Sequence, residues 1–273
     1  MDHEDDGTTM MLLVKSPGIS SMEAMAVSLD ALQGAVGHFQ KERLSHTASS
    51  YTLIANAEAL LVSAGGLPGL HAALSTLEFY QTHHTLRHTY NLGFMPAIVI
   101  PFDAPRFDWR GWHVDVARHF FSADVLLRAL GKIAALKFNV LHLHLTDDQG
   151  WRLQIPELPR LETVGAHRSR SPADAPTASI SGSFSDDDIR RIVDFCASTG
   201  IQVVPEIDFP GHAGAILASY PDLACEPHLT PGVVPHEWGE LPYSLCLRDE
   251  SATRRSLAFA KTVLLRVAKL FPQ

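Results

Sequence analysis

Histidine, carboxylate and arginine side chains gather in three segments in the second half of the sequence. The segment His142–Trp151 holds two histidines spaced i, i+2, then two aspartates and a glutamine. Glu206–His212 holds two acids and a histidine, and Arg110–His119 holds two arginines, two histidines and Asp115. Histidines and carboxylates hydrogen-bond hydroxyl groups and exchange protons, and the indole of Trp151 can stack on a sugar face. These residue types predict a polar, aromatic-lined pocket of the kind that takes carbohydrate.

Strands and helices are expected to alternate around these segments. The apolar patterns predict strands over 111–116, 138–145 and 201–207, and helices over 122–136 and 186–197. This rhythm is typical of a parallel sheet or barrel, in which the chemistry lies at the carboxyl ends of the strands. Two polar segments follow their strands directly and the third borders the first strand. We therefore expect all three to contribute to one pocket.

The first hundred residues predict a separate small α/β module. We expect helices over 22–38 and 70–80 and strands over 51–56, 59–64 and 97–100. His83, His84 and His88 could suggest a metal site, but they lie in a polar connecting stretch with no supporting carboxylate, so we interpret them as a solvated loop. After Pro105 the pattern changes to the alternating strands and helices described above, which predicts domains at 1–104 and 105–273.

Composition limits the classes of partner. The chain has 273 residues, of which 46% are hydrophobic, and a formal net charge of −8. This charge argues against nucleic acid or an anionic membrane surface as partner, and no apolar run reaches the ~18 residues of a membrane span. The acidic start does not resemble a signal peptide, which leaves localisation unknown. Cys196, Cys225 and Cys246 have no CxxC spacing; any pair could bridge, but we interpret them as buried or free thiols.

Three ordered motifs resemble glycoside hydrolase family 20, the β-N-acetylhexosaminidases. They are APRFDWRGWHVDVARHFF over 104–121, NVLHLHLTDDQGWR over 139–152 and VPEIDFPGH over 204–212. The stretch 245–272 resembles the family's approach to its fourth barrel strand, and the module before residue 105 resembles its non-catalytic N-terminal domain less specifically. The resemblance implies an α/β fold, with a small N-terminal α/β domain followed by the first part, about three βα units, of a TIM (β/α)8 barrel.

The resemblance also implies a chemistry. Family members remove terminal β-linked N-acetylglucosamine or N-acetylgalactosamine with retention, using the substrate's own acetamido group as nucleophile and no cofactor or metal. Arg110 would donate to the hydroxyls of the terminal sugar, while Asp147 and His212 would form the network that positions the acid. Trp151 would line the pocket or pack its loop. The implied partner is an oligosaccharide or glycoconjugate ending in N-acetylhexosamine. Relatives are often lysosomal, secreted or periplasmic, and homodimerisation is common among full-length relatives.

The catalytic acid of the family is the glutamate of an Asp-Glu pair at the end of the fourth strand, and no Gly-Gly-Asp-Glu string occurs here. We interpret Asp249-Glu250 as the cap and first turn of a helix that continues over 257–270. The stretch from Arg106 onward is shorter than the ~250 residues of a complete barrel. We therefore expect a barrel truncated at its end, and at its N-terminal side, that is inactive alone. Open edge strands and one exposed side of an apolar core would make it fold poorly or associate.

Other functions stay open beside this one. His142 and His144 lie on one strand face at a spacing that binds zinc in some barrel enzymes, with Asp147 or His212 as further ligands. That arrangement would indicate a metal-dependent hydrolase, although the motif match favours histidines that hydrogen-bond within the barrel. A non-catalytic sugar-binding remnant would keep Arg110 without turnover. An incompletely read gene of an ordinary enzyme is the third explanation.

Overall fold

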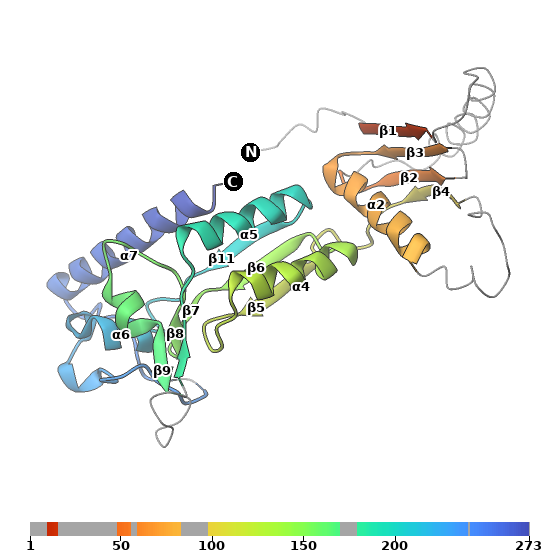
Figure 1. Ribbon diagram of the computed structural model, residues 1–273. Helices are drawn as coiled ribbons and strands as arrows, with labels where there is room; N and C mark the ends of the chain where they lie inside the picture. The colour runs from red at the N-terminus through yellow and green to blue at the C-terminus, as the bar shows by residue number, and fades with distance from the viewer. Residues whose placement is uncertain are drawn as a thin grey trace. The chain divides into compact units, whose positions relative to one another are not determined.

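The computed structural model describes residues 10–15, 48–55, 59–82, 98–169, 179–239 and 241–272. The chain divides into two compact units, the first comprising residues 1–110 with 132–139 and the second 111–131 with 140–273 (Figure 1). The predicted helix over 22–38 and the histidines His83, His84 and His88 lie outside the described residues. The predicted domain boundary after residue 104 stays a prediction. Within the described ranges, no helix has the length and apolar character to cross a membrane.

The first unit is a four-stranded antiparallel sheet in the order β1-β3-β2-β4, with one helix against it (Figure 1). The bounds are β1 Met10–Lys15, β2 Tyr51–Ala55, β3 Ala59–Ala64, α2 Leu67–Thr82 and β4 Ile98–Asp103. Alternate strand residues such as Leu53 and Val62 face the helix and are buried with Ala73. The predicted strand-helix pattern of this module is confirmed for its described part.

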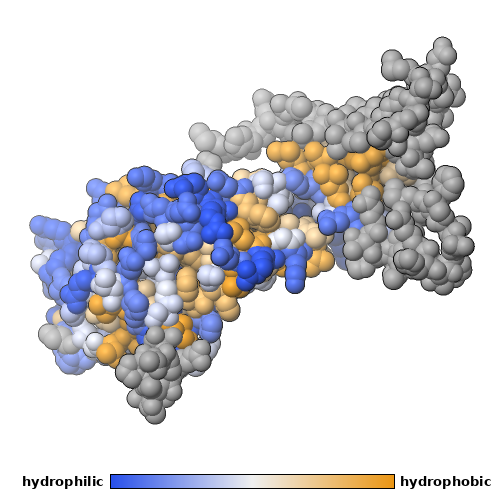
Figure 2. Space-filling model, viewed as in Figure 1, coloured by the Kyte–Doolittle hydropathy of each residue, from blue (hydrophilic) through white to orange (hydrophobic). Residues whose placement is uncertain are grey.

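A polar cluster lies at one end of this small core. The Tyr51 hydroxyl donates to Asp103 Oδ2 at 2.5 Å and accepts from Lys137 Nζ at 2.9 Å. Burial raises the pKa of the tyrosine, and the hydrogen bond to Asp103 raises it further. Figure 2 shows hydrophobic surface on this unit. Leu67 and Phe79 of α2 have exposed side chains.

The second unit is built on a parallel sheet in the order β5-β6-β11, with β6 in the middle (Figure 1). Its main elements are β5 Gly111–Asp115, α4 Ala123–Ala135, β6 Val140–His144, α5 Asp186–Ser198, β11 Gln202–Glu206 and α7 Glu250–Leu270. Helix and strand alternate as predicted. Apolar side chains on one face of the sheet pack against the helices. The buried residues of that layer are Val114, Leu126, Leu130, Leu141, Leu143, Ile189 and Ile192.

Short elements connect these layers. They are β7 Thr146–Asp147, β8 Gly150–Trp151, the π-helix Leu161–Gly165, β9 His167–Ser169, β10 Ser179–Ser181, α6 Gly214–Ser219 and the 3-10 turns Pro221–Leu223 and Pro227–Leu229. Two helices begin with side-chain caps. Ser185 and Asp188 form a reciprocal capping box on α5, and the Asp249 carboxylate accepts from the amide of Ala252 at 2.9 Å. The interpretation of Asp249-Glu250 as a helix start is confirmed.

The prediction of open edge strands and one exposed side of an apolar core stays a prediction, and the exposed leucines of α7 (Leu257, Leu264 and Leu265) are in keeping with it. The uncovered face of the sheet differs from that apolar side. Side chains at i and i+2 share a face of a strand, so the residues opposite the buried layer include His113, His142 and Glu206. All three are at least partly exposed. The face that does not meet the helices is therefore polar.

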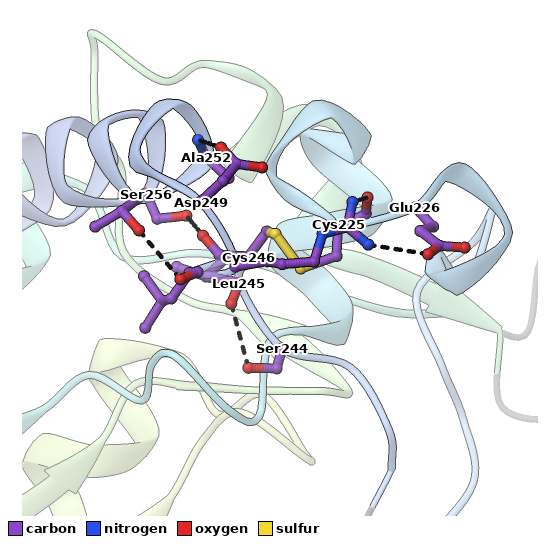
Figure 3. Close-up of a disulfide and its surroundings, with 11 residues drawn as sticks. Cys225, Glu226, Ser244, Leu245, Cys246, Asp249, Ala252 and Ser256 are labelled. Carbon is purple, nitrogen blue, oxygen red and sulfur yellow. Dashed lines mark hydrogen bonds and ion pairs between the residues drawn. A yellow bond between two sulfur atoms is a disulfide. The ribbon is translucent and has the colours of Figure 1, made fainter.

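The interpretation of the three cysteines as thiols is wrong for two of them. Cys225 and Cys246 form a disulfide across 21 positions of sequence (Figure 3). Cys196 is free and buried in α5, as expected. Burial raises the pKa of the Cys196 thiol to about 12, so this thiol is uncharged and unreactive at neutral pH. The disulfide closes the loop between residues 225 and 246.

Candidate active site

The last residues of the three parallel strands share one row. Asp115 pairs in register with His144, and His144 pairs with Glu206. Parallel strands end at the same edge of a sheet, so three ionisable side chains lie beside one another at the carboxyl edge. The short β7–β8 hairpin follows β6 directly and brings Asp147 to this edge.

Asp147 is the centre of the site. Its side chain is 1% exposed, and its Oδ2 lies 2.5 Å from Arg118 Nη2 and 2.8 Å from His144 Nε2. Its Oδ1 accepts from the Asp148 amide at 2.7 Å and lies 3.1 Å from His212 Nδ1. Burial raises the pKa of Asp147, but the hydrogen bonds from His144 and the Asp148 amide and the charge of Arg118 outweigh it, so the pKa is lowered. Asp147 is thus a buried carboxylate that is charged at neutral pH.

His144 lies between two carboxylates. Its Nδ1 is 2.8 Å from Glu206 Oε2, on the side of the ring opposite Asp147. Burial lowers the pKa of His144, whereas the hydrogen bonds to Asp147 and Glu206 raise it, and the net result is about 9. The ring is therefore an imidazolium at neutral pH, with both N–H groups donating.

Glu206 also contacts a second histidine, His142. Its Oε2 lies 2.7 Å from His142 Nε2 and 3.7 Å from His113 Nε2. Burial raises the pKa of Glu206, but the hydrogen bond and charge of His144 dominate and lower it. A polar network therefore runs from His113 on β5 to Glu206 on β11, then through His144 to Asp147.

The same network bears on the metal alternative. Among the described residues, three groups bring potential ligand atoms within 4.8 Å of one another: His113, His144 and Glu206; His144, Asp147 and Asp208; Asp147, Asp148 and His212. His142 belongs to none of these groups, so among the described residues no such group contains both His142 and His144, the pair considered for zinc.

The arginine that reaches the site is Arg118. It follows β5, and its guanidinium lies 2.9 Å from Asp115 Oδ2 as well as contacting Asp147. The Asp115 carboxylate also accepts from the amide of Arg118 at 3.0 Å. The Arg118 side chain is 26% exposed, and its two ion pairs leave further guanidinium N–H groups free to donate to a ligand.

Arg110 is held differently. It immediately precedes β5, and its guanidinium donates to the backbone carbonyls of Lys137 and Phe107, both at 2.8 Å. The predicted contact of Arg110 with sugar hydroxyls stays a prediction. A signal for Arg118 was present in the sequence, because Arg118 follows the first strand whereas Arg110 precedes it, and barrel chemistry lies at the carboxyl ends.

Trp151 requires a correction. Its side chain has no exposed surface, its indole N–H donates to the Leu153 carbonyl at 2.6 Å, and its ring packs edge-on against Phe259. A fully buried side chain does not contact a ligand. Trp151 packs the loop and the core, which is the second of the two roles considered for it.

His212 and Asp147 are brought together, as their motifs led us to expect. His212 follows β11 with a left-handed backbone (φ 51°), a conformation that is uncommon outside glycine and that clusters at functional sites. Its side chain is 44% exposed. Because Nδ1 faces Asp147, Nε2 is the ring nitrogen placed to meet a ligand.

A buried arginine braces the strand end that carries Arg118. Arg152 is fully buried and donates to the carbonyls of Val116 and Ala117, at 3.0 and 2.8 Å. Burial lowers its pKa to about 10, which still leaves it charged. A Cβ at Gly150 would lie 2.3 Å from its guanidinium, so only glycine permits this close packing.

A βα sheet with an arginine, a carboxylate and a histidine converging at its carboxyl edge defines a barrel-type protein with a polar ligand site. The catalytic domain of glycosyl hydrolase family 20 matches residues 107–273. The chain belongs to this family, and its parallel sheet with the flanking helices is part of a TIM barrel.

Individual relatives agree with this assignment. The chain is 46% identical over 125 residues to a beta-hexosaminidase of Akkermansia muciniphila, covering 46% of this chain and 25% of that protein. It is 40% identical over 174 residues to a beta-N-acetylhexosaminidase of Cellulomonas fimi, covering 64% of this chain and 33% of the relative. Among solved structures, a beta-N-acetylhexosaminidase superposes with a TM-score of 0.72 at 35% identity, over 84% of this chain and 46% of the other.

A mutant beta-hexosaminidase of Streptomyces plicatus in complex with its product GlcNAc has a TM-score of 0.64 at 31% identity. It covers 84% of this chain and 44% of that one. The chain thus spans less than half the length of each of these relatives.

Proposed function

We propose that this chain supplies one side of a β-N-acetylhexosaminidase site, the side that binds the terminal sugar and positions the proton donor. The observation that carries the proposal is the convergence of Arg118 and His212 on the buried carboxylate of Asp147. Relatives with the same fold bear the name of this activity, and one was solved with GlcNAc bound.

The different exposure of Asp147, Arg118 and His212 indicates which of them would contact the sugar. Asp147 is buried, so it acts on its neighbours rather than on the sugar, whereas Arg118 and His212 each present an exposed edge. A charged guanidinium held by two carboxylates is a rigid donor for vicinal hydroxyls. His212, oriented by Asp147, would hydrogen-bond the acid that protonates the leaving oxygen. Arg110 would instead brace the backbone before β5.

A matched pair of variants tests these roles. Arg118→Lys keeps the charge beside Asp147 but loses the planar guanidinium, which can donate two hydrogen bonds at once. We therefore expect GlcNAc affinity to fall by at least about tenfold. Arg110→Lys should leave GlcNAc affinity unchanged. Isothermal titration with GlcNAc measures both, and thermal melts establish that each variant is folded. Loss of affinity in the Arg110 variant, with none in the Arg118 variant, would return the sugar contact to Arg110.

Turnover separates hydrolysis from binding alone. Because the sequence has no Gly-Gly-Asp-Glu string, we propose that this chain binds terminal N-acetylhexosamine without hydrolysing a 4-nitrophenyl β-N-acetylglucosaminide. Sustained release of 4-nitrophenol that is abolished by Arg118→Lys would show that an acid is present elsewhere in the chain. Homodimerisation of the full-length protein is likewise a proposal.

A further inference from the structure

The loop closed by the disulfide is fixed at its base. Cys246 donates its amide to the Leu223 carbonyl at 2.8 Å, and the Ser256 hydroxyl donates to the Cys246 carbonyl at 2.8 Å (Figure 3). Arg248 pairs with Glu226 across the two ends at 3.0 Å. A covalent link reinforced in this way limits the conformations open to the chain between 225 and 246.

The same loop is anchored beside the candidate site. Gln149, which is buried two residues after Asp147, donates its side-chain amide to the Glu237 carbonyl at 2.7 Å. Pro235 packs against Gly214, two residues after His212, so closely that a Cβ on the glycine would lie 2.8 Å from the proline ring. Both anchors come from residues adjacent to the site, so the loop borders it.

The loop presents one large aromatic side chain to solvent. Trp238 is 80% exposed, although Val234 and Pro235 a few residues earlier are buried. Gly239 follows with a φ of 109°, a backbone that other residues rarely adopt, and is exposed together with Glu237 and Trp238 at the tip of the loop. The exposed indole is suited to stack on a flat apolar face of a ligand. Because the disulfide and the two anchors already hold the loop, binding would cost little conformational entropy.

We propose that Trp238 stacks on the sugar ring next to the terminal N-acetylhexosamine, on the leaving-group side. This inference rests on the proposed function. The terminal sugar would bind at Arg118 and His212. The loop is anchored beside them, through Gln149 and Gly214, so the sugar ring within its reach would be the one next to the terminal sugar. A β-linked pyranose with equatorial substituents offers a flat C–H face that matches an indole. The exposed tip is a single aromatic between Glu237 and a glycine, which is too small for an interface between copies.

The test compares two ligands, GlcNAc and N,N'-diacetylchitobiose, by isothermal titration against the full chain. The wild type should bind the disaccharide about five- to tenfold more tightly than GlcNAc, as expected for one stacked ring. Trp238→Ala should reduce this ratio to about one without changing the affinity for GlcNAc. Trp238→Phe should retain part of it, and Val233→Ala, an exposed neighbour on the same loop, should retain all of it.

An unchanged affinity ratio in Trp238→Ala would overturn the inference and leave the proposed function intact. A lower sedimentation coefficient of that variant with an unchanged ratio would assign the indole to contact between copies, and would overturn the inference too. No binding of GlcNAc by any variant or by the wild type would overturn the proposed function itself, and the stacking role with it.

Discussion

Asp147→Ala is expected to destabilise the fold by about 3–5 kcal/mol, because it leaves the buried His144 cation and the half-buried Arg118 without their shared carboxylate. His144 and Arg118 both contact Asp147 Oδ2, and the Asp148 amide and His212 face the other oxygen. Urea denaturation at pH 7 measures the loss directly, and GlcNAc affinity should fall in the fraction that remains folded.

Two further variants make this result specific. Asp147→Asn keeps the shape and some hydrogen bonds but removes the charge, so it should also be destabilising and should lower the pKa of His144. Asp124→Ala removes an exposed carboxylate that pairs with Arg191 at 2.6 Å on the surface, and it should cause little change. Equal stability of Asp147→Ala and Asp124→Ala would contradict the proposed central position of Asp147.

Stability should also fall as the pH rises from about 6.5 to 9. The pKa of His144 is raised to about 9 in the folded chain, from 6.5 when unfolded, so the folded state binds the proton more tightly. The resulting stabilisation is fully present below pH 6.5 and is lost as the pH passes through 9. It amounts to roughly 3 kcal/mol, from 1.36 kcal/mol for each pKa unit.

The free energy of unfolding at pH 6 and at pH 9.5, for the wild type and for His144→Gln, measures this effect. The wild type should lose more stability than the variant across the interval, because only the wild type can release the His144 proton. His119→Gln, at an exposed histidine near the same strand end, should behave like the wild type. An identical pH dependence in the wild type and His144→Gln would show that His144 does not carry the buried proton.

The order of elements in the second unit could be predicted because its apolar periodicities are strong. Leu141 and Leu143 alternate with His142 and His144, so the leucines pack in the apolar layer while the histidines lie on the opposite, polar face. The same alternation could have shown that the open face is polar, because the histidines share it. Strand β1 was not predicted, because six apolar residues without flanking turn signals do not distinguish a strand from other apolar segments.

The site could be predicted only in part. Asp147 and His212 follow their strands, so their meeting at the carboxyl edge follows from topology. Two arginines in one motif could be separated only by where β5 begins and ends, and strand boundaries are the least certain part of a sequence interpretation. The burial of Trp151 depends on Phe259, more than a hundred residues later.

The disulfide joining Cys225 and Cys246 had no sequence signal, because pairing between distant cysteines depends on the path of the chain. The same limit applies to Trp238. Its exposure beside the site becomes visible only once Gln149 and Gly214 are seen to anchor its loop.

The most direct test of the proposed sugar site is a nuclear magnetic resonance titration that follows arginine and histidine side-chain signals as GlcNAc is added. The signals of Arg118 and His212 should shift together and saturate, and glucose, which lacks the acetamido group, should produce much weaker shifts. His119 provides an exposed histidine signal for reference. Saturable shifts confined to residues away from Arg118, Asp147 and His212, or equal responses to the two sugars, would contradict an N-acetylhexosamine site at this edge of the barrel.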